Sequence, residues 1–130
     1  MLAVDTNVLI RLLVDDPGAQ AQCDRARSRV RTEKCLYVPL VSVIEAIWVL
    51  RDSYRFSKQE KLRVFEKLLE NEQYRIQDEE LIGDALNTYK SANVDFADCV
   101  IHAGARREGI GLLTFDLKLA RLAGVEILRA

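Results

Sequence analysis

The stretch MLAVDTNVLIRLLV, residues 1–14, decides the fold class, because it joins a short apolar run to a helical pattern through a polar turn. Residues 1–4 are apolar and have the length of a buried strand, and residues 5–7 close this run. The helical pattern of residues 8–14 ends before Asp15, Asp16 and Pro17. The chain therefore opens with a predicted strand followed directly by a predicted helix.

The same alternation continues to the end of the chain. Further strands are predicted at residues 36–38, 74–77, 111–114 and 125–128, and helices at residues 19–30, 43–54, 58–69, 81–89, 95–108 and 116–122. Most of the strands have apolar rather than alternating patterns, which is typical of a parallel sheet covered by helices on both faces. We therefore predict a single α/β domain over residues 1–130, a three-layer α/β/α sandwich with a central, mainly parallel sheet.

Composition sets limits on the function. The chain has 130 residues, a net charge of −1, and 49% hydrophobic and 30% charged residues, which fits one soluble domain. No run of about 18 apolar residues occurs, and Asp5 and Arg11 interrupt any signal segment, so we expect a cytoplasmic protein with no membrane partner. Three scattered cysteines and one histidine do not supply a zinc site, and we expect reduced thiols.

A basic stretch stands out locally and consists of Arg25, Arg27, Arg29, Arg31 and Lys34. Such a stretch is either a solvated helix face or a surface that contacts phosphate groups. The net charge does not decide between them, because carboxylate-bound metal ions would add positive charge that the sequence does not show.

Four acids stand where a parallel sheet binds its ligands. Asp5 and Asp116 follow predicted strands, and Glu45 and Asp98 lie near the starts of predicted helices. The carboxyl ends of the strands and the helix N-termini meet at one edge of such a sheet, so these carboxylates can converge in one cleft. Converging carboxylates repel, and a hard divalent cation with oxygen ligands relieves the repulsion. An acid-only site of this kind, with no Cys or His partner, suits metal-dependent phosphoryl-transfer chemistry.

Each acid also has a structural alternative. Ser42 and Glu45 match the spacing of a capping box. Asp95 and Asp98 fit a helix cap and a first-turn acid, and Asp116 fits a cap of the last predicted helix. The polar run after the first strand fits an ordinary strand-to-helix turn.

Four ordered motifs carry a family resemblance: VDTNVL at residues 4–9, VIE at 43–45 with WVL at 48–50, DFAD at 95–98, and LTFDLKLA at 113–120. With these motifs the sequence resembles the PIN-domain ribonucleases, and among them the VapC-type toxins of bacterial and archaeal toxin–antitoxin pairs. The resemblance covers nearly the whole chain.

This resemblance implies an endoribonuclease that depends on Mg²⁺ or Mn²⁺ and cuts RNA, which halts growth. Such a ribonuclease typically works as a homodimer and is inhibited by a cognate antitoxin. The resemblance assigns catalysis to Asp5, Glu45, Asp98 and Asp116. The first three are the implied metal ligands, and Asp116, the more variable acid, is expected to act behind them or as a further ligand. Supporting roles are implied for Asn7 and Thr114, which would orient the acids, and for Asp95 unless it caps its helix.

His102 departs from the pattern, because similar proteins carry a small apolar residue four positions after Asp98. It either contacts the acids or is a helix histidine packed or solvated beside the site, and we favour the second reading. A phosphatase of the haloacid dehalogenase type would need a second Asp where Asn7 stands. The main alternative is a catalytically silent PIN-like module that binds RNA or protein. DNA as the substrate stays open, since nothing visible contacts a 2′-hydroxyl.

Overall fold

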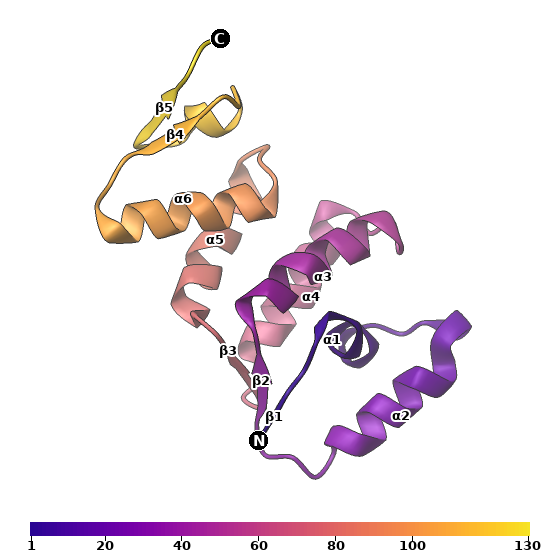
Figure 1. The fold of residues 1–130 in the computed structure, drawn as a ribbon. Coiled ribbons are helices and arrows are strands. Elements are labelled where there is room, and N and C mark those ends of the chain that lie inside the picture. Colours follow the sequence, from indigo (N-terminus) through magenta and orange to yellow (C-terminus); the bar gives the residue numbers. More distant parts are fainter. The chain divides into compact units, whose positions relative to one another are not determined.

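The computed structural model describes all residues from 1 to 130, and the chain divides into two compact units, Met1–Glu79 (unit 1) and Glu80–Ala130 (unit 2) (Figure 1). Helices and strands alternate along both units, as the sequence predicts. None of the helices is long and apolar enough to span a membrane. The prediction of a single domain stays a prediction.

Unit 1 is built on a parallel sheet of three strands in the order β1 (Leu2–Ala3), β2 (Leu36–Val38) and β3 (Tyr74–Ile76). In this register Leu36 lies opposite Leu2 on one side and Tyr74 on the other. The central strand is the most buried of the three, and its Leu36 and Val38 are fully buried. The predicted parallel pairing is confirmed for these strands.

The helices of unit 1 are α1 (Thr6–Leu13), α2 (Gln20–Val30), α3 (Leu40–Asp52) and α4 (Lys58–Glu70), with a 3₁₀ turn η1 (Pro17–Ala19) before α2. Helix α1 packs against both α2 and α3, and Leu9, Ile10 and Ile47 are buried in this core. Each such side chain contributes about 1.5–3 kcal/mol by leaving water. Several boundaries differ from the prediction; for example, Ala19 belongs to η1, and α3 ends before Tyr54.

Unit 2 consists of α5 (Glu79–Ser91), which begins at the unit boundary, α6 (Phe96–Glu108), and a parallel pair of strands, β4 (Leu112–Thr114) and β5 (Val125–Ile127). Phe96 is fully buried and its ring meets Tyr89 edge-on at 5.7 Å between centroids. Gly109 ends α6 in the left-handed conformation, as expected for a glycine at a helix C-terminus. The helix predicted over residues 116–122 is only a 3₁₀ turn, η2 (Leu119–Arg121).

The cysteines form no disulfide. Cys23 on α2 is fully buried in unit 1, Cys99 on α6 is fully buried in unit 2, and Cys35 is partly exposed. Each buried thiol therefore belongs to the packed interior of a different unit.

Candidate active site

Asp5 directly follows β1 and caps helix α1. Its backbone is extended, and its Oδ1 accepts a hydrogen bond from the N–H of Val8 at 2.9 Å. This geometry confirms the strand-to-helix turn that was the structural alternative for residues 5–7. The cap engages one carboxylate oxygen, and the side chain is exposed, so the second oxygen is accessible to a cation.

Glu45 lies inside helix α3 instead of at its start. The helix begins at Leu40 with Pro39 as its N-cap residue, and the N–H of Leu40 donates to Oε1 of Gln77 at 2.9 Å. Ser42 is therefore already within the helix and makes no cap. The capping-box alternative for Ser42 and Glu45 is wrong, because a side chain from a distant segment supplies the cap one turn earlier.

Two hydrogen bonds tie α3 to the turn that carries Asp5. The hydroxyl of Thr6 donates to Oε1 of Glu45 at 3.1 Å, and the buried hydroxyl of Ser42 donates to the carbonyl oxygen of Val4 at 3.4 Å. Val4 and Thr6 flank Asp5 in the chain. The structure thus brings Glu45 to the start of α1, at the end of β1, as the sequence predicts for these two acids.

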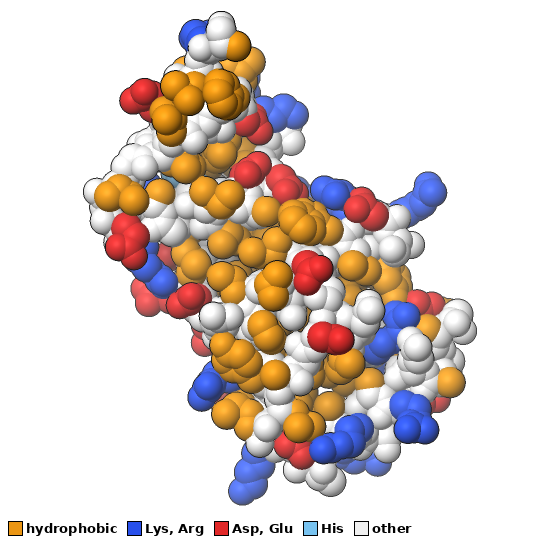
Figure 2. Space-filling view, in the orientation of Figure 1, with side chains coloured by type: hydrophobic (Ala, Val, Ile, Leu, Met, Phe, Trp, Pro, Cys, Tyr) orange, Lys and Arg blue, Asp and Glu red, His pale blue; other side chains and the backbone are white.

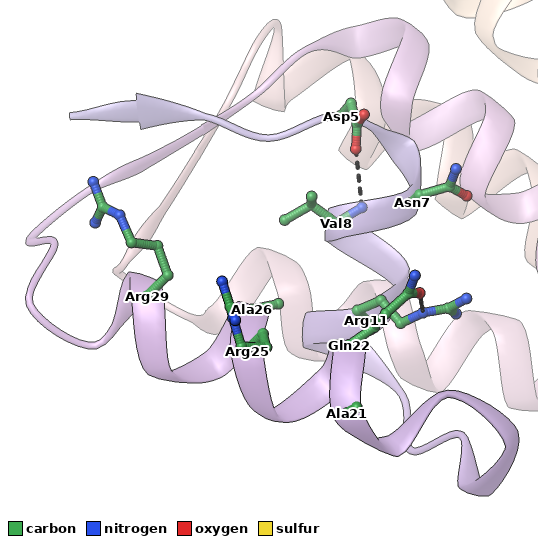
Figure 3. A pocket seen from close by; sticks show the side chains of 9 residues that line it. All are labelled: Asp5, Asn7, Val8, Arg11, Ala21, Gln22, Arg25, Ala26 and Arg29. Carbon is green, nitrogen blue, oxygen red and sulfur yellow. Dashed lines mark hydrogen bonds between the residues drawn. The ribbon is translucent and has the colours of Figure 1, made fainter.

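A pocket of unit 1 opens beside Asp5, between α1 and α2 (Figure 3). Asp5, Asn7 and Val8 line it from the start of α1, and Arg25 and Arg29 line it from α2. The predicted supporting residue Asn7 therefore shares a pocket with Asp5. Two members of the predicted basic stretch also reach this pocket, which pattern analysis of the sequence did not foresee.

In unit 2, Asp98 lies in the first turn of α6 among other carboxylates. Its side chain is partly buried. Burial raises the pKa of Asp98, and the negative charges of Asp95 and Asp116 raise it further. The structure therefore places Asp98 within electrostatic reach of two other predicted acids.

The structural alternatives for Asp95 and Asp116 have opposite outcomes. Asp95 occupies the N-cap position of α6, but its side chain makes no capping hydrogen bond, so the cap assigned to it is wrong. Asp116 does cap the turn after β4, since its Oδ1 accepts from the N–H groups of Lys118 at 2.7 Å and Leu119 at 3.3 Å. Thr114 accepts from the N–H of Asp116 at 3.0 Å and so holds this turn.

His102 is a packed helix histidine, as favoured above. It is 9% exposed, and its Nε2 lies 2.8 Å from the carbonyl oxygen of Ala123. A carbonyl oxygen only accepts, so Nε2 carries a proton in this contact. The hydrogen bond fixes the ring against the chain segment before β5.

The donor set fits a hard divalent cation. The side chains at issue offer carboxylate oxygens only, which Mg²⁺ and Mn²⁺ prefer, and no cysteine or histidine joins them. A bound cation would relieve the repulsion of Asp98 by the neighbouring carboxylates. In neither unit do three or more such acids stand close enough to hold an ion by themselves.

With this α/β fold and this set of acids, the chain belongs to the PIN domain family, whose model matches residues 2–125. The match confirms the predicted α/β/α fold class. The chain is also 27% identical, over 112 residues, to a VapC ribonuclease of Aquifex aeolicus (strain VF5), covering 85% of this chain and 82% of that protein. The resemblance inferred from the four motifs is thereby confirmed.

Proposed function

We propose that this PIN domain protein is an endoribonuclease that depends on Mg²⁺ or Mn²⁺ and hydrolyses RNA phosphodiester bonds. One observation carries the proposal: in a chain of this family, the partly buried Asp98 lies among the carboxylates of Asp95 and Asp116. Such an arrangement is unfavourable without a cation and favourable with one. RNA as the substrate is supported by the name of the Aquifex relative.

The proposed catalytic acids are Asp5, Glu45, Asp98 and Asp116. Asp5, Glu45 and Asp98 would hold the cation, and Asp116 would act behind them or as a further ligand. When bound, the cation supplies the positive charge that polarises a phosphate oxygen and lowers the pKa of an attacking water. Asn7, Thr114 and Asp95 are the proposed supporting groups.

The chain's own hydrogen bonds prepare these acids. The N–H of Val8 fixes the rotamer of Asp5, and the hydroxyl of Thr6 fixes the carboxylate of Glu45. Partners of this kind orient metal ligands, and their loss typically costs about 10- to 100-fold in metal affinity or activity. Thr6 is therefore a positioning residue that the sequence analysis did not single out.

The experiment is cleavage of a labelled single-stranded RNA by purified protein with Mg²⁺, with Mn²⁺ and with a chelator. Wild-type protein should cleave only with metal, and Asp5→Asn and Asp98→Asn should each abolish cleavage while the circular dichroism spectrum stays unchanged. Asp84→Asn, an exposed acid on α5, is the matched control and should cleave normally. A wild-type protein that is inactive in both metals but binds RNA or protein would instead be the catalytically silent module.

We further propose the role of a toxin in a toxin–antitoxin pair, acting in the cytoplasm on cellular RNA as a homodimer. The similarity to the VapC ribonuclease supports this role. A small antitoxin reading frame should then lie directly upstream, and induced expression should stop growth only when Asp5 is intact. Growth arrest by Asp5→Asn would contradict the role, and sedimentation of the purified chain as a monomer would contradict the dimer.

A further inference from the structure

Arg25 and Arg29 lie one helical turn apart on α2, and both line the pocket that contains Asp5. Figure 3 shows Asp5 at the top of this pocket and the two arginines along α2 below it. Residues four apart on a helix have their Cβ atoms about 5–6 Å from each other, so the two guanidinium groups form one cationic edge. Figure 2 shows basic side chains gathered over α2, although the chain as a whole has a net charge of −1.

The neighbouring arginines of unit 1 already have partners inside the protein. Arg11 donates to the hydroxyl of Tyr54 at 2.7 Å and to Gln22 at 2.8 Å. Arg27 turns away from the pocket and bonds Asp15 at 2.9 Å. These two side chains hold the fold together, and their charges are locally compensated.

Arg25 and Arg29 differ from these neighbours. Both side chains are exposed. Arg29 makes one surface ion pair, with Glu33 at 3.3 Å, of a kind worth about 0–1 kcal/mol, so a stronger anion can displace it. Arg25 makes no ion pair or hydrogen bond with the rest of the protein. The cationic edge of the pocket is therefore available to an external anion.

The rest of the pocket indicates what kind of anion fits. Val8, Ala21 and Ala26 contribute apolar surface to the lining, and Asn7 offers an amide. A nucleic acid strand matches this lining, because its repeated phosphate charges meet the arginines of an otherwise uncharged stretch of α2 surface. In a protein proposed to cleave RNA, such a strand must also pass Asp5, which an acidic peptide need not do.

We propose that Arg25 and Arg29 bind phosphate groups of a single-stranded RNA and thereby position the strand across Asp5. The inference rests on the proposed ribonuclease function and adds to it a substrate path on unit 1. Arg25 and Arg29 are positioning residues, since they contact phosphates away from the bond that is cut. Their removal should weaken substrate binding and leave the chemical step intact.

The test separates binding from cleavage. Anisotropy of a labelled 12-nucleotide RNA, measured in a chelator, compares wild type, Arg25→Gln/Arg29→Gln, and the control Arg63→Gln/Lys67→Gln, which removes two exposed charges one turn apart on α4. We expect Kd to rise at least about tenfold for the α2 pair only. The slope of log K against log salt should fall by about 0.7 for each lost phosphate contact.

Cleavage kinetics with metal give the second readout. The α2 pair should raise KM and leave kcat within about twofold, and Arg25→Lys/Arg29→Lys should recover part of the binding, because lysine keeps the charge but not the planar fork. Equal RNA binding by wild type and the α2 pair, or equal losses in the α4 control, would overturn the inference. The inference would also be overturned if Arg25→Gln/Arg29→Gln kept its affinity for RNA but lost affinity for a glutamate-rich peptide. A wild type that binds RNA through these arginines and never cleaves it would remove only the ribonuclease proposal.

Discussion

Asp16 in unit 1 and Asp98 in unit 2 are both partly buried carboxylates, yet their pKa values move in opposite directions. Asp16 accepts hydrogen bonds from the hydroxyl of Tyr54 at 2.7 Å and from the N–H of Gly18 at 2.9 Å, and these donors lower its pKa. The pKa of Asp98 is raised by its burial and by the negative charges of Asp95 and Asp116. The first carboxylate has its partners within the protein, and the second lacks them.

This difference separates a carboxylate whose hydrogen-bond donors lie within the fold from one that the fold leaves next to like charges. A carboxylate that accepts two or three donors is a structural element, and its loss should affect stability. A carboxylate pressed against others is unfavourable for the fold, which is typical of sites where function sets the arrangement. Substitutions at the two positions should therefore affect different measurements.

The largest expected effect is on cleavage. Asp98→Asn should lower the rate of RNA cleavage by more than about 100-fold, because loss of a metal ligand costs more than the 10- to 100-fold typical for its outer partners. Asp16→Asn should cleave RNA at close to the wild-type rate once folded. Rates under single-turnover conditions test this pair, and equal losses in both variants would remove the contrast between the two acids.

Metal binding should stabilise the folded protein against unfolding. At about 100 times its Kd, Mn²⁺ should stabilise the wild type by about 2.7 kcal/mol, measured as a rise in Tm, and Asp98→Asn should lose most of this gain. Without metal the order should reverse, since Asp98→Asn removes a repelling charge and should melt above the wild type. A metal-free Asp98→Asn that is less stable than wild type would show that the carboxylate has a structural partner.

Removing a hydrogen-bond donor of Asp16 should lower the stability of the protein by an amount that depends on pH. Tyr54→Phe removes the largest cause of the lowered Asp16 pKa and also a bond from Arg11, so it should destabilise the folded protein at pH 7. Because a lowered pKa stabilises the fold above the usual aspartate value of about 3.9, this part of the difference should disappear as the pH falls through the lowered pKa. Urea unfolding at several pH values measures it, and a difference that stays constant with pH would contradict the assignment to Asp16.

The smallest expected effect concerns a cap remote from the acids. Ser57→Ala should destabilise the protein by about 1 kcal/mol, because the Ser57 hydroxyl accepts from the N–H of Glu60 at 3.1 Å. Cleavage and metal binding should not change. Thermal melting with and without Mn²⁺ checks this variant, and a reduced response to metal would show that α4 contributes to the site.

Two stretches of the sequence have the spacing of a capping box, and only one of them forms it. Ser57 and Glu60 form the capping box that their spacing indicates, with both reciprocal hydrogen bonds present. Ser42 and Glu45 do not, because Gln77 from a distant segment caps α3 earlier. Local patterns predict a helix end when its partners are local, and they fail when tertiary structure supplies the partner.

At the candidate site, too, local features could be predicted from the sequence and contacts between distant residues could not. The positions of Asp5, Asp98 and Asp116 after strands or in a first helical turn could be predicted, since strand ends and helix starts are visible in the sequence. The bond from Thr6 to Glu45 joins residues 39 positions apart, and no periodicity indicates it. Tyr54 was predicted as the last residue of a helix, whereas it lies beyond the end of α3 and its hydroxyl donates to the carboxylate of Asp16, 38 positions away.

The buried thiols give each unit its own reporter of local opening. A thiol reagent reaches Cys23 only when unit 1 opens and Cys99 only when unit 2 opens, while the partly exposed Cys35 reacts first. Mass spectrometry of partly modified protein would therefore follow two opening rates in one experiment. Identical rates would mark residues 1–130 as one cooperative unit of unfolding, and a cation that slows modification of Cys99 would show which interior it stabilises.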